Sequence, residues 1–129
     1  MPEITWSERF SVGVRVLDEQ HKRLIEMINA IQGKSDASTM FGVVMQMFNY
    51  TANHFQTEEK LMRSRGYSEL DQQIRQHKEF LSKTTDFAGR DFDNPAARAQ
   101  VESYLREWLV HHILEEDMKY KNLLSKDGC

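Results

Sequence analysis

Apolar residues recur at three- and four-residue steps along four stretches of this 129-residue chain. That spacing places their side chains on one face of an α-helix, whereas the strict alternation typical of strands is nearly absent. Only two prolines interrupt the chain. We therefore predict an all-α fold, and because the length suits one ordinary domain, residues 1–129 are expected to form a single helical domain.

Residues with capping and terminating preferences divide the first half of the chain into an arm and two helices. The arm runs to about Leu17, and three of its apolar residues are expected to fold back over the bundle: Trp6, Phe10 and Val12. The first helix is predicted to open at Asp18 and to end near Gly33. The second is expected to stop at Gly66, and its N-cap candidates are Ser35, Asp36 and Ser38.

The second half of the chain shows two more helix starts. Ser68, with Asp71 three residues later, resembles a capping box that opens a third helix. A loop over residues 89–93 follows, and Asn94 as N-cap with Pro95 in the first turn opens the fourth. Short loops between long helices favour antiparallel neighbours, so we predict an up-down-up-down four-helix bundle with an N-terminal arm.

Composition argues against several classes of partner. The net charge is −3 and the basic residues are scattered, so a nucleic-acid partner is not expected. No apolar run approaches the roughly twenty residues that span a bilayer, and the first residues lack the features of a secretory signal. We therefore expect a cytoplasmic protein without a membrane partner. The lone cysteine, Cys129, is the last residue and is assigned no role.

His54 and Glu58 are the firmest local indication of a binding site. They lie four residues apart in the predicted second helix, so both side chains project from one face, one turn apart. Their apolar neighbours place this face inward. A buried glutamate without a partner lowers the stability of the fold by roughly several kcal/mol. A cation is therefore expected opposite Glu58.

The other inward histidines are His21, His77 and one member of the pair His111 and His112. Neighbouring apolar residues place His112 rather than His111 on the buried face of the fourth helix. His21 and His77, each taken alone, are better explained as core histidines that donate to a backbone carbonyl.

A carboxylate is expected beside His112, but the spacing leaves its identity open. Glu116 is four residues away, as an ideal helix prefers, and Asp117 is five residues away. Taken together, four inward imidazoles and at least two inward carboxylates from four helices are too polar for a small core without a cation. These donors predict a dinuclear site for iron, manganese or zinc.

The chain resembles the bacterial hemerythrins from Trp6 to about Leu124. The motifs that carry the resemblance are the arm with Trp6 and Gly13, Asp18-x-Gln20-His21-x-x-Leu24, His54-Phe55-x-x-Glu58-Glu59-x-x-Met62, Gly66-Tyr67, His77-x-x-Phe80, and Trp108-Leu109-x-x-His112-Ile113-x-x-x-Asp117-x-x-Tyr120. The resemblance implies a four-helix domain with two iron ions that binds O2 reversibly at one of them, with Glu58 and Asp117 as bridging ligands.

By the same resemblance, His21 and His54 hold the iron that takes O2, and His77 and His112 hold the other. The family has a further histidine four residues before His77, where this chain has Gln73. The resemblance also implies a dry wall around the O2 pocket, formed by Leu24, Phe55, Trp108, Leu109 and Ile113.

Three arrangements are open at the position of Gln73. Its amide oxygen coordinates the metal, a water takes the place, or Glu69 or Gln76 from a neighbouring turn swings in. In each case one iron has two imidazoles instead of three. That metal is then expected to be held less firmly, and partial occupancy or a mixed-metal site becomes plausible.

The function implied is O2 binding for carriage, storage or sensing. The alternative is a di-iron peroxidase, oxidase or ferroxidase, because an incomplete histidine shell would give small oxidants such as peroxide access to both metals. A metal-free helical interaction module is a third hypothesis, and it requires the inward donors to satisfy one another.

Overall fold

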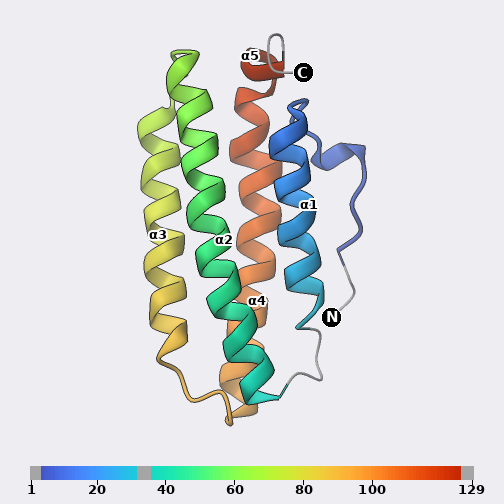
Figure 1. Ribbon diagram of the computed structural model, residues 1–129, viewed down its shortest axis with the longest axis vertical. Helices are drawn as coiled ribbons and strands as arrows, with labels where there is room; N and C mark the ends of the chain where they lie inside the picture. The colour runs from blue at the N-terminus through green and yellow to red at the C-terminus, as the bar shows by residue number, and fades with distance from the viewer. Residues whose placement is uncertain (1–3, 32–35, 126–129) are drawn as a thin grey trace.

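Four long helices stand side by side and run alternately up and down (Figure 1). The computed structural model describes residues 4–31 and 36–125, and no strand occurs among them. The helices are α1 (Arg15–Asn29), α2 (Ala37–Ser64), α3 (Leu70–Ala88) and α4 (Pro95–His111). The predicted all-α class and the antiparallel four-helix bundle are confirmed.

The end of α4 continues as an irregular helix. A π-helical segment, η2 (His112–Glu116), follows directly and leads into a short 3₁₀ segment, η3 (Asp117–Tyr120). A last short helix, α5 (Lys121–Ser125), lies near the C-terminal end at the top of Figure 1. The arm contains one 3₁₀ turn, η1 (Glu8–Phe10). The change in helix type after α4 was not predicted.

Several predicted helix ends are confirmed. The side chain of Asp36 accepts a hydrogen bond from a backbone N–H in the first turn of α2 at 2.7 Å. Asn94 caps α4 in the same way, at 2.9 Å, and a proline occupies the first turn. Gly66, two residues after α2, has φ +68°, a left-handed conformation that glycine adopts without steric cost.

The predicted start of the first helix was wrong by three residues. α1 begins at Arg15, and the carboxylate of Asp18 does not cap it but accepts hydrogen bonds from Val12 N at 2.8 Å and Ser11 Oγ at 2.6 Å. These donors belong to the arm, so Asp18 fastens the arm to the bundle. α1 ends at Asn29, earlier than the predicted end near Gly33, and Gly33 itself and the cap candidate Ser35 lie outside the described residues.

The predicted capping box at the start of the third helix is also absent. α3 begins at Leu70, and its N-cap residue Glu69 makes no side-chain capping bond. Ser68 lies in a turn in which the N–H of Leu70 donates to the carbonyl of Tyr67 at 3.3 Å. A backbone turn therefore takes the place of the expected Ser68 cap.

The arm folds back as predicted. Phe10 and Val12 are fully buried, and the half-buried ring of Trp6 stacks on Phe10 with 5.8 Å between ring centroids. In Figure 1 the arm runs beside α1 on the outer side of the bundle. These contacts extend the apolar interior beyond the four long helices.

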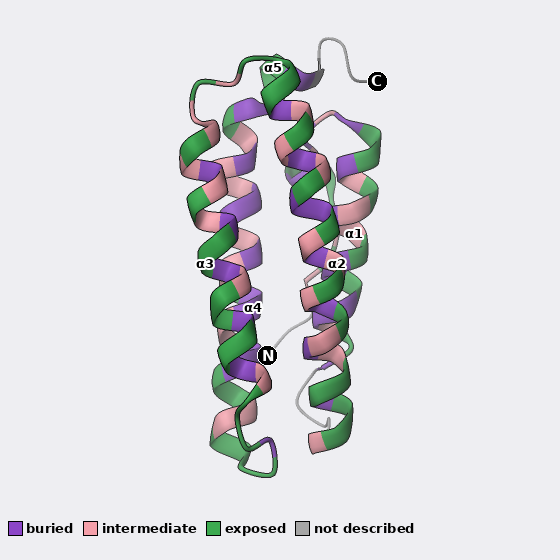
Figure 2. Cartoon of the chain, turned by 60° about the vertical axis from the view of Figure 1, so that its left-hand side comes forward, coloured by how far each residue is buried: buried purple, intermediate pink, exposed green. Residues whose placement is uncertain are grey.

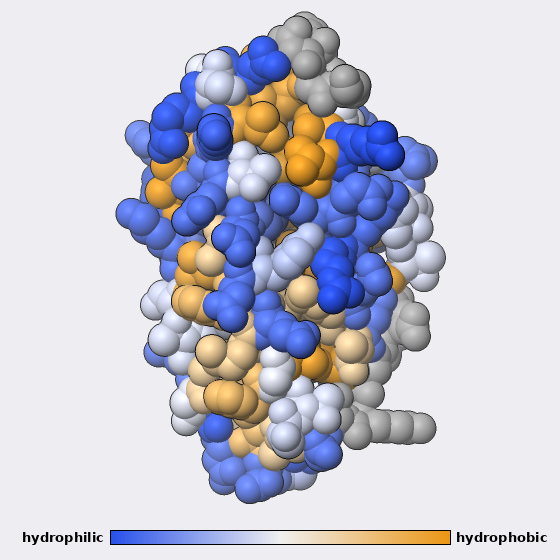
Figure 3. Space-filling view, viewed as in Figure 1, coloured by the Kyte–Doolittle hydropathy of each residue, from blue (hydrophilic) through white to orange (hydrophobic). Residues whose placement is uncertain are grey.

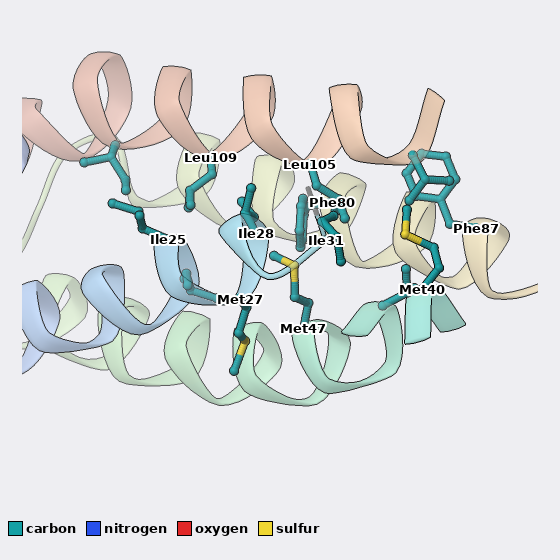
Figure 4. Packing of buried hydrophobic residues seen from close by; sticks show 14 of the residues in the cluster. Ile25, Met27, Ile28, Ile31, Met40, Met47, Phe80, Phe87, Leu105 and Leu109 are labelled. Carbon is teal, nitrogen blue, oxygen red and sulfur yellow. The ribbon is translucent and has the colours of Figure 1, made fainter. Parts of the chain in front are cut away.

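The apolar core lies in two parts along the bundle axis. The larger part joins inward residues of all four helices, and Figure 4 labels several of them, among them Ile28, Met47 and Leu105. The smaller part, at the end of the bundle near η3, contains Met62 and Tyr120. Buried positions form continuous inner faces on the long helices (Figure 2).

The outer surface is polar over most of the face shown in Figure 3, with hydrophobic residues showing between the charged ones. Among the described residues, no helix has both the length and the apolar character that a membrane crossing requires.

Candidate metal centre

Seven buried polar side chains from the four helices of the bundle lie close together, and each is at most 5% exposed. They are His21 from α1, His54 and Glu58 from α2, Gln73 and His77 from α3, and His112 and Asp117 from the segment after α4. All seven site residues predicted from the sequence thus lie in one cluster.

Glu58 stands at the middle of this cluster. Its Oε1 lies 2.9 Å from His77 Nε2, and its Oε2 lies 3.5 Å from His21 Nε2 and 3.6 Å from His54 Nε2. The buried hydroxyl of Tyr120 donates to Oε2 at 2.6 Å. The two oxygens of one carboxylate therefore face imidazoles from three helices.

Asp117 takes a similar position across the cluster. Its Oδ1 lies 3.1 Å from His112 Nε2 and accepts a hydrogen bond from Gln73 Nε2 at 3.1 Å, and its Oδ2 lies 3.3 Å from His21 Nε2. The Nε2 atoms of His77 and His112 are 3.2 Å apart. Each carboxylate thus reaches imidazoles on both sides of the cluster.

These donors define two overlapping positions for a cation. Ligand atoms of His21, His54 and Glu58 lie within 4.8 Å of one another, and so do those of Glu58, His77 and His112. Glu58 belongs to both groups. Nitrogen and carboxylate donors with a shared oxygen ligand suit a pair of transition-metal ions.

The π-helical segment determines which acidic residue enters the cluster. The backbone N–H of Asp117 donates to the carbonyl of His112, five residues earlier, and the widened turn puts both side chains on the same face. Glu116 instead faces outward, where it accepts from Gln72 Nε2 at 3.2 Å and pairs with Lys119 Nζ at 3.3 Å. The structure therefore brings Asp117, and not Glu116, into the cluster.

Side chains of neighbouring helices hold the outer nitrogens of three imidazoles. The Nδ1 contacts are His54 to Gln20 Oε1 at 2.6 Å, His77 to Glu59 Oε2 at 2.7 Å, and His112 to Gln76 Oε1 at 2.9 Å. Because the partners are oxygen acceptors, each Nδ1 can donate to its partner while Nε2 faces the cluster. An imidazole held in this way binds a metal ion through Nε2.

These three partners were not predicted from the sequence. Each is the neighbour in sequence of a candidate ligand: Gln20 precedes His21, Glu59 follows Glu58, and Gln76 precedes His77. That adjacency was the available signal. It could not show that each partner reaches a histidine on the next helix, because this depends on how the helices pack.

Charges in the cluster shift its pKa values strongly. Burial opposes protonation of His21, but contacts with Asp117 and Glu58 outweigh burial and raise its pKa to about 9. Burial lowers the pKa of His54 to about 4. Burial also opposes ionisation of Glu58, yet the neighbouring imidazoles hold its pKa well below the ordinary value. Without metal, the cluster retains a proton on His21 beside two ionised carboxylates.

Several buried atoms of the cluster have no aligned hydrogen-bond partner within the part of the chain that the structure describes. They are both ring nitrogens of His21, Oε1 of Glu58, Oε1 of Gln73 and Oδ2 of Asp117. A buried polar atom without a partner costs about 1–3 kcal/mol, and more if charged. Divalent cations placed among these atoms would satisfy most of them, so the residues present fit a metal pair.

Gln73 lies one turn before His77 on the same face of α3. The two other residues considered for its place are engaged elsewhere. Glu69 is partly exposed and lies 3.8 Å from Lys119 Nζ, while Gln76 holds the outer nitrogen of His112. The arrangement in which Glu69 or Gln76 enters the cluster is not the one the structure adopts.

Two cavities adjoin the cluster. A small enclosed one of about 10 Å³ is lined by His21, His54, His112 and Asp117 together with the five expected apolar wall residues Leu24, Phe55, Trp108, Leu109 and Ile113. It has space for about one small molecule of the size of water. A larger surface cavity of about 340 Å³ reaches His112 from outside, past Gln76 and Trp108.

Comparison with known proteins gives consistent matches over nearly the whole chain. Residues 12–124 match the family model of the hemerythrin HHE cation-binding domain. A bacteriohemerythrin of Pseudomonas aeruginosa is 32% identical over 124 residues, covering 93% of this chain and 80% of the relative. A hemerythrin from Sipunculus nudus is 34% identical over 119 residues, covering 92% of each. A crystal structure of wild-type hemerythrin matches with a TM-score of 0.81 and 26% identity, over 96% of this chain and 99% of that one.

Proposed function

Because this chain belongs to the hemerythrin family, with residues 12–124 matching its cation-binding domain, we propose that it is an O2-binding protein with a non-haem pair of iron ions. The observation that carries the proposal is the position of the two buried carboxylates. Glu58 and Asp117 each lie between imidazoles from opposite sides of the bundle.

In this proposal His21 and His54 hold one iron, and His77 and His112 hold the other. Glu58 and Asp117 would supply carboxylate ligands to both ions. The inward Nε2 atoms and the oxygen atoms without aligned partners support the assignment. The charges also agree, because two carboxylates and neutral imidazoles offset part of the charge of two divalent ions.

When bound, a pair of ferrous ions supplies the electrons with which O2 is held. The chain's own residues orient the donors and keep the site dry. Tyr120 fixes Glu58 Oε2 through a hydrogen bond of 2.6 Å, and acceptors on neighbouring helices fix three of the imidazoles. The small cavity beside His21 and His54 has mostly apolar walls, which exclude water and so slow irreversible oxidation of the iron.

The test is reversible O2 binding by iron-loaded protein. Protein loaded with ferrous iron without O2 is exposed to O2, and the visible absorption spectrum is recorded before exposure, after it and after O2 is removed. We expect a coloured form that appears with O2 and disappears when O2 is removed. Irreversible oxidation, or no spectral change in protein that holds two irons per chain, would contradict the proposal.

A second candidate is an enzyme, a di-iron peroxidase, oxidase or ferroxidase. The observation that favours it is the surface cavity of about 340 Å³, through which a reductant could approach His112. Gln73 supports it too, because one imidazole fewer leaves one metal with a less complete nitrogen shell. Catalytic turnover of peroxide, or of O2 with a reductant or excess ferrous iron, by the iron-loaded protein would identify this function in place of reversible binding.

The proposal also includes the expected cytoplasmic location, which cell fractionation would test.

A further inference from the structure

We infer that the side-chain oxygen of Gln73 is a ligand of the metal ion held by His77 and His112, and that it makes this position the weaker of the two. The inference rests on the proposed metal centre and adds a donor to it. It concerns the position at which this chain departs from the hemerythrin pattern.

The hydrogen bonding of Gln73 fixes which way its amide points. Nε2 donates to Asp117 Oδ1 at 3.1 Å. The opposite orientation would place the amide oxygen against the carboxylate, where two acceptors repel each other. Oε1 therefore points away from Asp117. This oxygen is buried, the residue is 1% exposed, and Oε1 has no hydrogen-bond partner among the described residues.

Neighbouring contacts keep α3 in register with the segment that carries the other ligands. Gln72 donates to Glu116, Gln73 donates to Asp117, and Gln76 accepts from His112, at 3.2, 3.1 and 2.9 Å. Three glutamines of α3 thus bind three residues of the irregular segment after α4. These contacts hold the side chain of Gln73 next to Asp117, whose Oδ1 lies 3.1 Å from His112 Nε2.

Water is the other occupant to consider for this position. A site for one water needs roughly 10–15 Å³ of free volume. The enclosed cavity and the surface cavity are both lined by His112, but Gln73 lines neither. Neither of these two cavities therefore places a water molecule at the amide oxygen of Gln73.

The donor type determines the strength of this position. An amide oxygen is neutral and binds a divalent ion less firmly than an imidazole does, and it favours harder ions such as Mn²⁺ and Fe²⁺. The position of His21 and His54 has no such replacement. We therefore expect metal to fill the position of His21 and His54 first and the position of His77 and His112 second. The two positions are also expected to accept different metals.

The experiment is an anaerobic titration of metal-free protein with Co²⁺, followed by visible absorption and by elemental analysis of the bound metal. Wild-type protein is expected to bind two ions, the second at least about tenfold more weakly. Gln73→His should bring the second affinity close to the first. Gln73→Ala and Gln73→Leu should weaken the second ion by roughly a further tenfold or more, since even outer-shell changes cost about 10–100-fold, and should leave the first ion unchanged.

Gln73→Ala separates the two occupants because it opens room for water. If the Ala variant binds the second ion as tightly as wild type, water is the ligand and the inference is overturned. Gln100→Leu is the matched control, since this exposed glutamine of α4 contacts Arg90 and lies outside the metal-binding cluster. It should bind both ions like wild type.

Gln73→Glu distinguishes the loss of a ligand from a folding defect caused by substitution at this position. It retains an oxygen at the same place and should hold the second ion at least as tightly as wild type. Loss of that ion in folded Gln73→Glu, judged by circular dichroism, would overturn the inference. Failure of wild-type protein to bind any ion would instead refute the proposed metal centre itself.

Discussion

The backbone N–H of Asp117 donates to the carbonyl oxygen of His112, five residues earlier, and this π-helical turn brings both side chains to the buried cluster. In a regular α-helix the residue four positions after His112 would occupy that face. The segment behaves like an α-helix with one extra residue, and the extra residue is accommodated on the outer side.

Deletion of Glu115 tests this view of the segment. Its side chain is 68% exposed, and its removal would place Asp117 four residues after His112, the spacing of a regular helix. We expect the variant to retain two metal ions per chain by elemental analysis. Deletion of the exposed Glu107 is the control, because it rotates His112 away from the bundle interior and should abolish binding. Loss of metal in both deletions would show that the π-helical turn itself is required.

Replacement of the two neighbouring acids should have opposite outcomes. Asp117→Asn removes a carboxylate that reaches His112 and His21, so we expect fewer than two ions per chain. Glu116→Gln changes an outward side chain bound to Gln72 and Lys119 and should leave the metal content unchanged. Equal metal content in the two variants would contradict the bridging role of Asp117.

Tyr120→Phe removes one buried hydroxyl and leaves the ring in place. The lost hydrogen bond goes to the ionised Glu58, so we expect a decrease in the free energy of unfolding of about 1.5–3 kcal/mol, measured by urea denaturation of metal-free protein. Tyr104→Phe, at a half-buried tyrosine outside the cluster, is the control and should change stability much less. A neutral effect of Tyr120→Phe would mean that Glu58 finds another donor.

The raised pKa of His21 predicts how metal affinity depends on pH. Its proton, retained up to a pKa of about 9 against an ordinary value of 6.5, must leave before Nε2 can bind metal. Affinity should therefore rise with pH up to about 9, as calorimetric titration would show. In metal-free protein the same group stabilises the fold fully below pH 6.5, and this contribution is lost as pH rises through about 9. Affinity that stays constant between pH 6.5 and 9 would be inconsistent with a protonated His21.

The helices and their buried faces were predictable because each depends on local residue spacing. His54 and Glu58 share a face in any regular helix, and Asp36 or Asn94 caps the helix that follows it directly. Asp18 shows the limit of this reasoning. Its carboxylate could either cap a helix or bind the arm, and the sequence is compatible with both. The packing of the arm determines that it binds Ser11 and Val12.

The parts of the site that depend on contacts between helices could not be predicted from spacing. Asp117 rather than Glu116 enters the cluster because of a π-helical turn, and no local residue preference in the sequence predicts this turn. The partners Gln20 and Gln76 act on histidines of other helices, so their roles required the packed bundle. The orientation of the Gln73 amide was likewise decided by a residue 44 positions away.

The most direct test of the metal centre is a crystal structure of iron-loaded protein with anomalous diffraction recorded at the iron edge. We predict two peaks within the bundle, one beside His21 and His54 and the other beside His77 and His112, with Glu58 and Asp117 between them. A single peak, or none, at this cluster in crystals grown from protein that contains two irons per chain would contradict the proposed di-iron centre.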